Sequence, residues 1–440
     1  MKNLSIAIMD VVPVLFLCCT CVVPVLAPVL HRPGDNLKTD NKMRKLENFH
    51  LLVMLIALIA VGQMTQTVYV PVITDIALDF GEPAGAVQSV MAAYLFTYGA
   101  SQLIYGPISD KVGRRPVILT GLVIYIIATT AALFSPNLTM LVVASGLQGL
   151  GTGVAGVMAR TMPRDLYTGI SLRYANSLLN MGILVSPLIA PMLGGALAAF
   201  FGWRACYAFL LVLGLAVGYN MWHKLPETRP AMKEKPKMWA SFRLLLTNRT
   251  FVPYLVMLIC GLAGVAVFEA SSGVLMRDGL GLGSMAVSVL FILPIPAAFF
   301  GAWFAGRDSK SFSFLVWCAV ICCLSAGVLM WIPGLLGIMN VWTLLIPASV
   351  FFFGAGMLFP LATTAAMEPF PYLAGAAGAL VGGLQNVGSG VITWISSLMP
   401  QGGQSSVGLL MVITGVVMVL CWARWLTGCS VRNQWHPDYC

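Results

Sequence analysis

The stretch 106–116 reads GPISDKVGRRP and decides the fold, because it is a short charged turn between two long apolar runs, 85–105 and 117–134. Each run is close to the roughly 20 residues that a helix needs to cross a bilayer. Backbone polar groups cannot stay unpaired in hydrocarbon, so only helices or closed barrels cross it. The runs lack the strict alternation of barrel strands and therefore predict transmembrane helices.

The composition extends this expectation to the whole chain. Of 440 residues, 59% are hydrophobic and 9% are charged, whereas an ordinary soluble domain has about 25% charged residues. The mean hydropathy is +0.88. The net charge of +9 does not indicate a nucleic-acid partner, because the basic residues lie in short segments between apolar runs, where orientation in the membrane accounts for them.

We expect an all-α membrane protein with twelve transmembrane helices in two six-helix halves. The predicted spans are 50–72, 85–105, 117–134, 138–160, 173–198, 204–223, 251–275, 284–305, 313–331, 342–366, 373–398 and 406–426. The longest polar stretch divides them six and six. The predicted parts are an N-terminal extension (1–48), a first half (49–223), a cytoplasmic linker (224–250), a second half (251–426) and a cytoplasmic tail (427–440).

Basic residues predict the orientation of the helices. With the linker in the cytoplasm, only Arg204 and Arg277 of the 25 Lys and Arg residues fall in external loops. An excess of basic residues on the cytoplasmic side is the rule for membrane proteins. Both ends of the twelve-helix body are therefore expected inside.

The apolar stretch Ile6–Leu30 lies outside these twelve spans. It contains Asp10 and three prolines, which disfavour a regular helix, and it lacks the features of an ordinary signal peptide. Met43 opens a short basic segment just before the first span. We expect the native protein to begin there; a thirteenth span is the alternative.

The sequence predicts no metal or cofactor site and no enzymatic activity. The eleven cysteines are scattered, and the group Cys18, Cys19 and Cys21 has no matching His or second Cys pair. The four histidines lie near span ends or in the tails, and no His, Asp and Ser set falls within the spans.

Residues 106–116 also carry a family resemblance. Gly106 and Gly113 permit a tight backbone path, Asp110 can accept a charge-assisted hydrogen bond from a nearby arginine, and Arg114 and Arg115 face the cytoplasm. A basic turn that only anchors topology is the simpler interpretation. The run resembles the loop signature of the major facilitator superfamily, Gly-x-x-x-Asp-x-x-Gly-Arg-Arg/Lys-Pro. This resemblance implies two halves that alternately open a central site, with the Asp110 loop steadying one gated state.

The fifth predicted span carries a second resemblance. It has two prolines four residues apart among small residues; prolines kink a spanning helix and small residues permit close helix packing. An ordinary kinked packing helix is one interpretation. The stretch 182–195 also resembles the Gly-Pro-x-x-Gly-Pro-x-x-Gly-Gly motif of drug:proton antiporters, with Ser186 and Ala190 replacing two glycines. The candidate motif residues are Ser186, Pro187, Pro191, Gly194 and Gly195.

The proton-coupling residue is predicted to be Glu269. The family usually has an arginine, used in proton handling, where this chain has Ser145, so that relay is not carried over. Of sixteen acidic residues, only Glu269 lies well inside a predicted span, and an ionisable residue in lipid indicates function. Burial favours its protonated form, which suits a group that binds and releases a proton. A carboxyl that is permanently paired or held protonated is the alternative.

Side chains that share helix faces are expected to line a central cavity. Aromatic groups with few hydrogen-bonding partners suit bulky apolar ligands, and the 24 methionines can repack around varied ones. Helix packing or an interfacial belt is the alternative for each aromatic. Arg160 either guards the cytoplasmic mouth or only anchors the topology. The predicted lining is Gln63, Gln66, Tyr69, Tyr94, Tyr98, Ile259, Phe291, Ile295 and Trp342, of which Ile259 and Trp342 are implied by resemblance to a multidrug exporter of this group.

The predicted function is proton-coupled efflux of amphipathic or hydrophobic toxic compounds by alternating access, in a monomer of the bacterial inner membrane. The expected partners are such small molecules, protons and the lipid bilayer. A proton-coupled exporter of a small metabolite such as a sugar is the alternative, although it needs more hydrogen-bonding groups than the predicted lining supplies. A receptor without flux is a further one.

Overall fold

The structure, a computed structural model, describes residues 39–167, 169–229, 238–306, 311–370, 373–400 and 403–430. The chain divides into two compact units, Met1–Leu55 and Ile56–Cys440. The described part of the first unit is the beginning of helix α2 (Thr39–Thr67). The stretch 1–38, with the apolar segment Ile6–Leu30, lies outside the described residues, so an N-terminal extension and a start at Met43 stay predictions.

The first predicted half contains seven α-helices and one short 3-10 turn within the described residues. After α2 come the 3-10 turn η1 (Val70–Val72), α3 (Ile73–Phe80), α4 (Ala84–Val112), α5 (Arg114–Leu133), α6 (Leu138–Leu166), α7 (Gly169–Phe201) and α8 (Arg204–Lys224). The first span therefore continues beyond residue 72. Gly81, with a φ of 68°, ends α3 in the left-handed conformation that favours glycine at helix ends.

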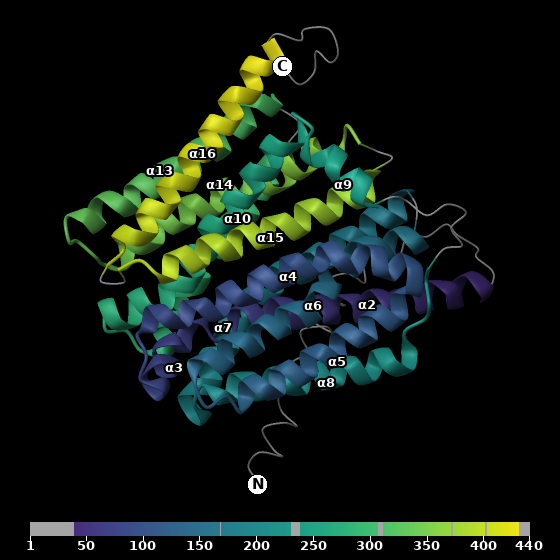
Figure 1. Cartoon of the computed structure of the whole chain (residues 1–440), viewed down its shortest axis with the longest axis horizontal. Coiled ribbons are helices and arrows are strands. Elements are labelled where there is room, and N and C mark those ends of the chain that lie inside the picture. Colours follow the sequence, from purple (N-terminus) through teal and green to yellow (C-terminus); the bar gives the residue numbers. More distant parts are fainter. Residues whose placement is uncertain are drawn as a thin grey trace. The chain divides into compact units, whose positions relative to one another are not determined.

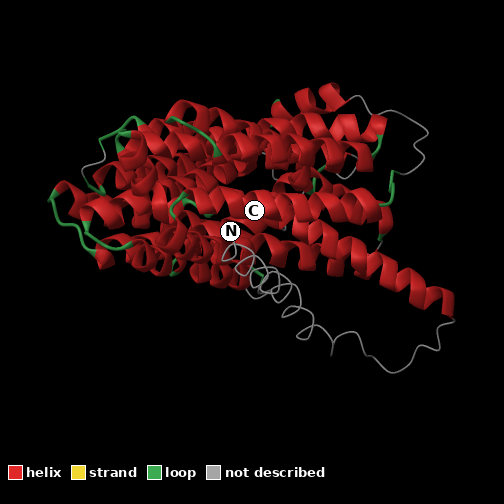
Figure 2. Cartoon of the chain, turned by 90° about the horizontal axis from the view of Figure 1, so that it is seen from below, coloured by secondary structure: helices red, strands yellow, loops and turns green. Residues whose placement is uncertain are grey.

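The linker and the second predicted half are also helical where they are described. They contain α9 (Met238–Leu246), α10 (Phe251–Val274), the π-helical turn η2 (Leu275–Gly279), α11 (Ser284–Ile292), α12 (Ile295–Ala305), α13 (Phe312–Leu335), α14 (Val341–Met367), α15 (Ala374–Ser397) and α16 (Ser405–Ser430). Figure 2 shows helices and connecting loops but no strand in the described part of the chain. The predicted all-α class is confirmed.

Nine of the described helical segments are long and apolar enough to cross a membrane. The other three predicted spans correspond to α4, α7 and α15. Helix α4 packs against both α6 and α15, and α15 also packs against α10. Helices enclosed by other helices need fewer apolar residues than helices that face lipid, which explains why α4 accommodates the buried amides of Gln88 and Gln102.

The eighth predicted span is interrupted, because α11 ends at Ile292 and α12 begins at Ile295. The N–H of Leu293 donates to the carbonyl of Leu290 (3.2 Å) and that of Ala297 to the carbonyl of Pro294 (3.1 Å). These are the tighter i to i−3 bonds of a 3-10 turn. Proline lacks an N–H and cannot continue the α-helical ladder. The predicted span 284–305 coincides with the candidate membrane segment Ser284–Ala305, which contains this break between two shorter helices.

The two sets of helices meet mainly along α4 and α15, which lie side by side (Figure 1). A Cβ at Gly99 would clash with the backbone of Gly383 and Val387, and one at Gly390 would clash with the backbone of Phe96. Small residues therefore let the two backbones approach closely. Helix α7 joins the second set through α11, and η1 contacts α10.

Candidate functional site

A buried carboxyl lies between the two sets of helices. Glu269 on α10 is 7% exposed and is the one buried acidic residue in the part of the chain that the structure describes. The side-chain Nε2 of Gln66, near the end of α2, donates to its Oε2 at 3.2 Å. This bond connects residues that are 203 positions apart. The predicted proton-coupling residue thus forms a polar link between the two halves.

Tyr69 lies close along the chain to Gln66 and is 3% exposed. Its ring stacks on that of Tyr207, with centroids 6.3 Å apart. Its hydroxyl is buried and has no hydrogen-bond partner among the described residues. An unpaired buried hydroxyl is unfavourable, so this group can donate to or accept from a bound molecule at little cost.

Tyr94 and Tyr98 share a face of α4, as predicted from their spacing. Their rings are stacked, with centroids 5.7 Å apart and planes inclined by 15°. The hydroxyl of Tyr94 donates to the carbonyl of Gly62 (2.6 Å) and lies 2.9 Å from that of Thr152. Tyr94 is therefore held by helices α2 and α6 and serves as a fixed wall for Tyr98.

A polar network beneath these tyrosines was missing from the sequence predictions. The hydroxyl of Tyr125 lies 2.9 Å from that of Thr65, and Gln148 donates to Thr129 at 2.9 Å. All four side chains are buried. The sequence did contain a signal for this network. Tyr125 and Thr129 are four residues apart on one span, and Gln148 and Thr152 are four apart on another, and polar groups at that spacing share a helix face.

The second half supplies apolar members of the predicted lining, with one exception. Phe291 and Ile295 are buried, although the break in the helix lies between them. Ile259 is half-buried and packs against Gly388 of α15. Trp342 is 69% exposed at the beginning of α14. It is therefore not packed among buried side chains as the other apolar members are, and its place in a central cavity stays a prediction.

The Asp110 region forms a clasp where α4 meets α5, at the end of the first half that is predicted to be cytoplasmic. Nη1 of the buried Arg114 donates to Oδ1 of Asp110 at 2.6 Å, and its Nε donates to Asp165 of α6 at 3.1 Å. Asp110 lies within the last turn of α4 rather than in a loop. The connection is shorter than predicted, because α4 continues to Val112 and α5 begins at Arg114.

Glu227, which follows α8, closes this clasp. Its carboxyl accepts hydrogen bonds from the backbone N–H groups of Arg114 (2.8 Å) and Arg115 (3.2 Å). Partial burial acts to raise the pKa of Glu227, but backbone hydrogen bonds from Arg114, Arg229 and Arg115 outweigh it and hold this pKa below its usual value. Gly113, between the two helices, has a φ of 119°. Gly106 lies one turn before Asp110 and contacts Met238 of the linker.

Arg160, at the cytoplasmic end of α6, contacts the second half. Its Nη1 donates to the carbonyl of Gly378 in α15 at 3.2 Å and lies 3.4 Å from Oε1 of Gln102. This contact connects the two halves at the end that is predicted to be cytoplasmic. The sequence left a gate and a topology anchor as alternatives for Arg160.

The two arginines predicted to be external are each paired with an acidic residue of α3. Arg277 in η2 contacts Asp75 (2.5 Å) and also Ser284 (2.8 Å). Arg204 contacts Asp79 at 2.6 Å. The first pair connects the two halves at the external end, opposite Arg160.

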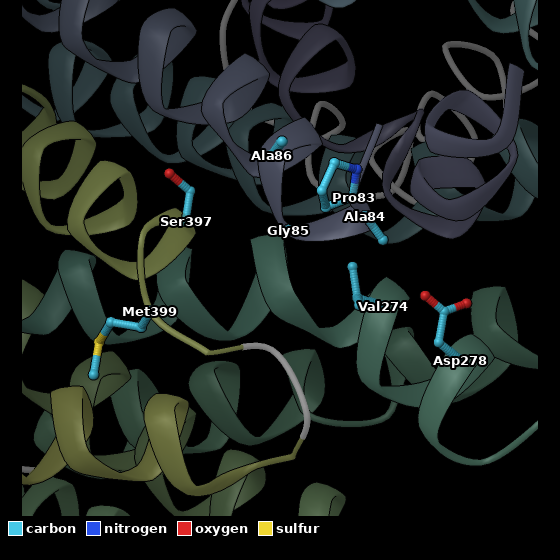
Figure 3. A pocket seen from close by; sticks show the side chains of 8 residues that line it. All are labelled: Pro83, Ala84, Gly85, Ala86, Val274, Asp278, Ser397 and Met399. Atoms are coloured by element: carbon cyan, nitrogen blue, oxygen red, sulfur yellow. The ribbon is translucent and has the colours of Figure 1, made fainter. Parts of the chain in front are cut away.

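A cavity of about 480 Å³ lies at the same external end (Figure 3). Its lining comes from the start of α4 (Pro83–Ala86), from Val274 and Asp278 of the second half, and from Ser397 and Met399 at the end of α15. The predicted lining residues do not line this cavity.

The candidate antiporter motif lies where α7 meets other helices. A Cβ at Gly194 would clash with the carbonyl of Val68, and one at Gly195 would clash with the hydroxyl of Ser288 on α11. Helix α7 runs through Pro187 and Pro191 without interruption. Ser186 is buried. Gly194 therefore permits close packing within the first half, and Gly195 permits the contact of α7 with α11 of the second half.

Comparison with known proteins places the chain in a family. The model of the Major Facilitator Superfamily matches residues 55–393. The chain belongs to this superfamily. It is therefore a multi-pass transport protein for small molecules and not an enzyme, and the predicted family, fold and bacterial inner-membrane location are confirmed.

Among its relatives is multidrug resistance protein D of Escherichia coli K12, which is 62% identical over 392 residues, 89% of this chain and 100% of that protein. A chloramphenicol resistance protein of Pseudomonas aeruginosa is 27% identical over 337 residues, 76% of this chain and 80% of that protein.

Two solved structures are also similar. The structure of the multidrug transporter EmrD from Escherichia coli has 64% identity and a TM-score of 0.43, covering 84% of this chain and 99% of that one. A bacterial homologue of the human lysosomal transporter Spinster, in an inward-facing and occupied conformation, has 16% identity and a TM-score of 0.65, covering 89% and 99%. The second shares the fold.

Proposed function

We propose that this protein is a proton-coupled exporter of hydrophobic and amphipathic compounds. The observation that carries the proposal is the buried Glu269 carboxyl, which accepts a hydrogen bond from Gln66 across the two halves. The high identity to multidrug resistance protein D of Escherichia coli supports the substrate class. The two six-helix halves, 49–223 and 251–426, would rock about the site between them, with 224–250 as the connecting linker and 427–440 as the tail.

Protonation of Glu269 would alter the link between the halves. A hydrogen bond to an ionised carboxylate is roughly twice as strong as one between neutral groups. Proton binding therefore weakens the Gln66 contact and makes separation of α2 from α10 easier. Release of the proton to the cytoplasm restores the stronger Gln66 contact. The proton gradient can therefore shift the equilibrium between the two conformations.

The side chains near this carboxyl favour apolar cargo over a sugar. Tyr69, Tyr98 and Phe291 are buried and offer large aromatic surfaces, and several polar groups of the first half already bond to the protein. The hydroxyl of Tyr94 and the amide of Gln148, for example, are occupied within the first half. A sugar needs several free polar partners, whereas an amphipathic molecule needs one or two. We assign transport to a single chain, because each half contributes to the site.

Two polar contacts would close the path at opposite ends. Asp75 with Arg277 joins the halves outside, and Arg160 with Gly378 joins them on the cytoplasmic side. In alternating access one of these contacts opens while the other holds. The Asp110 clasp, which includes Arg114 and Asp165, would steady the first half during this motion.

The proposal is tested by export in inverted vesicles with and without an imposed pH gradient. Glu269→Gln should abolish the stimulation by the gradient while leaving substrate binding within about threefold, since a 0.6 kcal/mol change corresponds to that factor. Glu82→Gln, which removes an exposed external carboxyl, is the matched control and should transport normally. Gradient-dependent export by Glu269→Gln would refute the proton assignment.

A second arm addresses the cargo. Wild-type vesicles are offered a lipophilic dye and a panel of neutral mono- and disaccharides under the same gradient. We expect dye export that is unaffected by an excess of sugar. Sugar export, or competition by sugar, would replace the multidrug proposal with the metabolite alternative.

A further inference from the structure

The short linker helix α9 exposes apolar side chains at the cytoplasmic end of the protein. Trp239 is 74%, Leu244 52% and Leu246 44% exposed, while Phe242 and Leu245 are buried against the body. The helix is therefore apolar on both its inner and its outer faces. In water such an outer face would be unfavourable by roughly 25 cal/mol for each Å² of apolar surface, so we look for what covers it.

The position of α9 indicates the depth at which this face lies. The helix contacts α10 and α15, and Met238 at its start contacts Gly106 of α4. Gly106 is six residues before the end of α4 at Val112, which is about 9 Å along a helix at 1.5 Å per residue. Interfacial helices lie about 5–10 Å into the boundary between headgroups and acyl chains. In Figure 1, α9 lies beside the ends of α10 and α15 rather than beyond them.

The charge around α9 indicates which lipid it meets. The linker 224–250 contains seven basic and two acidic residues. One acid, Glu227, is occupied by the clasp. Arg243 and Arg249 are exposed, and neither forms an ion pair with a residue that the structure describes. Three further lysines precede α9 in the stretch 230–237, which lies outside the described residues.

We propose that the outer face of α9, formed by Trp239, Leu244 and Leu246, is a docking surface for the cytoplasmic leaflet, and that Arg243 and Arg249 select anionic phospholipid headgroups there. The tryptophan takes the interfacial position that this residue type prefers. The arginines pair with phosphate, for which their planar donors are well suited. Because α9 also contacts α4 next to the Asp110 clasp, the lipid would stabilise the packing of the linker against both halves.

The first test measures lipid retention by native mass spectrometry on the full, delipidated chain. Phosphatidylglycerol and phosphatidylcholine with the same acyl chains are titrated separately. Wild type should retain phosphatidylglycerol at a concentration about 30-fold lower, because each of the two arginines near an anionic surface contributes about 1 kcal/mol and 1.4 kcal/mol is a factor of ten. Arg243→Gln with Arg249→Gln should remove most of this preference.

The matched control removes two other cytoplasmic charges, with Lys224→Gln and Arg424→Gln, and should keep the preference. Equal retention by wild type and both double variants would overturn the proposal, as would an equal loss in both, which would show only a general charge effect. Millimolar inorganic phosphate should not displace the lipid; if it does, the surface is a free-anion site and not a membrane docking surface.

The second test places Trp239 directly. Fluorescence of wild type and Trp239→Phe is compared in nanodiscs whose acyl chains carry bromine near the headgroup, and the difference reports Trp239. Quenching of this difference by the brominated lipid, with protection from aqueous acrylamide, is the expected result. The opposite pattern would place the face in water and overturn membrane docking, even if export is normal.

Discussion

At Gly113 the backbone has a φ of 119° and a ψ of 159°, a region that only glycine occupies readily. A Cβ there would also meet the carboxyl of Glu227. The glycine therefore allows α5 to begin one residue after α4 ends and brings the backbone N–H groups of Arg114 and Arg115 to that carboxyl.

Gly113→Ala should lower the free energy of unfolding by about 1–3 kcal/mol, because the backbone is strained and Glu227 is displaced. Thermal unfolding of the purified protein, followed by fluorescence, measures it. Gly375→Ala is the control, since a Cβ there meets open space. Equal melting temperatures for Gly113→Ala and wild type would contradict the clasp geometry.

Two buried tyrosines should respond differently to loss of the hydroxyl. Tyr94→Phe leaves the carbonyl of Gly62 without its donor and should cost about 1 kcal/mol or more. Tyr69→Phe removes a hydroxyl with no partner among the described residues, so its stability should change by less than about 0.5 kcal/mol, while affinity for substrates with a polar group falls. Unfolding and dye-binding titrations of both variants measure these effects. A stability loss as large for Tyr69→Phe as for Tyr94→Phe would indicate a hidden partner.

Sequence reasoning at this scale found Glu269 but not its partner. A lone carboxyl inside an apolar run is visible from composition alone. That Gln66 contacts it depends on how α2 and α10 pack, because the sequence analysis placed Gln63 and Gln66 only in the cavity lining. The surroundings of Trp342 could not be predicted for the same reason, because an aromatic at a helix end can face lipid, water or the interior.

At the scale of helices, the contact between α4 and α15 depends on glycine. Gly99 lies against the backbone of Gly383 and Val387, where a methyl group has no room. A side chain there must push two helices apart, and overpacking of this kind typically costs 1–3 kcal/mol.

We therefore expect Gly99→Ala to lower the melting temperature and to slow export, because α4 and α15 can no longer pack at their normal distance. Gly146→Ala on α6 is the control, since its nearest contact would be Cγ2 of Thr97 at 3.6 Å, which is ordinary packing. Export rates and unfolding curves for the two variants decide the matter. If Gly99→Ala and Gly146→Ala have the same export rate and melting temperature, close packing of α4 against α15 is not needed for transport.

The elements themselves were largely predictable, since long apolar runs and their polar separators are local properties of the chain. The sequence did not show which prolines interrupt a helix within a span. Pro294 and Pro296 break a span that composition presents as continuous, whereas Pro187 and Pro191 lie in an uninterrupted helix. Tertiary packing decides between these outcomes.

For the whole molecule, the external pair Asp75 and Arg277 connects the two halves. Both side chains are partly exposed, and such pairs contribute at most about 1 kcal/mol to stability. A contribution of that size is small for unfolding but large enough to shift an equilibrium between two conformations severalfold.

Neutralising either partner, with Asp75→Asn or Arg277→Gln, should therefore open the external side more often without unfolding the protein. The rate at which a membrane-impermeant maleimide labels a cysteine placed at Val274, which lines the external cavity, should rise severalfold. The exchanged pair Asp75→Arg with Arg277→Asp should restore the original rate. Unchanged labelling in both single variants would argue against an external gate.

The sequence by itself determined the class of protein, the number and division of its helices and the existence of one interior carboxyl. Each of these follows from local composition or from spacing along one helix, whereas the orientation inferred from the bias of charge between loops stays a prediction. Only the tertiary structure decided that Glu269 meets Gln66, that α4 pairs with α15 and that Glu227 closes the Asp110 clasp. Gln66 and Glu269 are 203 positions apart, and Arg114 and Glu227 are 113 positions apart. They arise from how apolar helices of similar composition pack together, which no single stretch of the chain specifies.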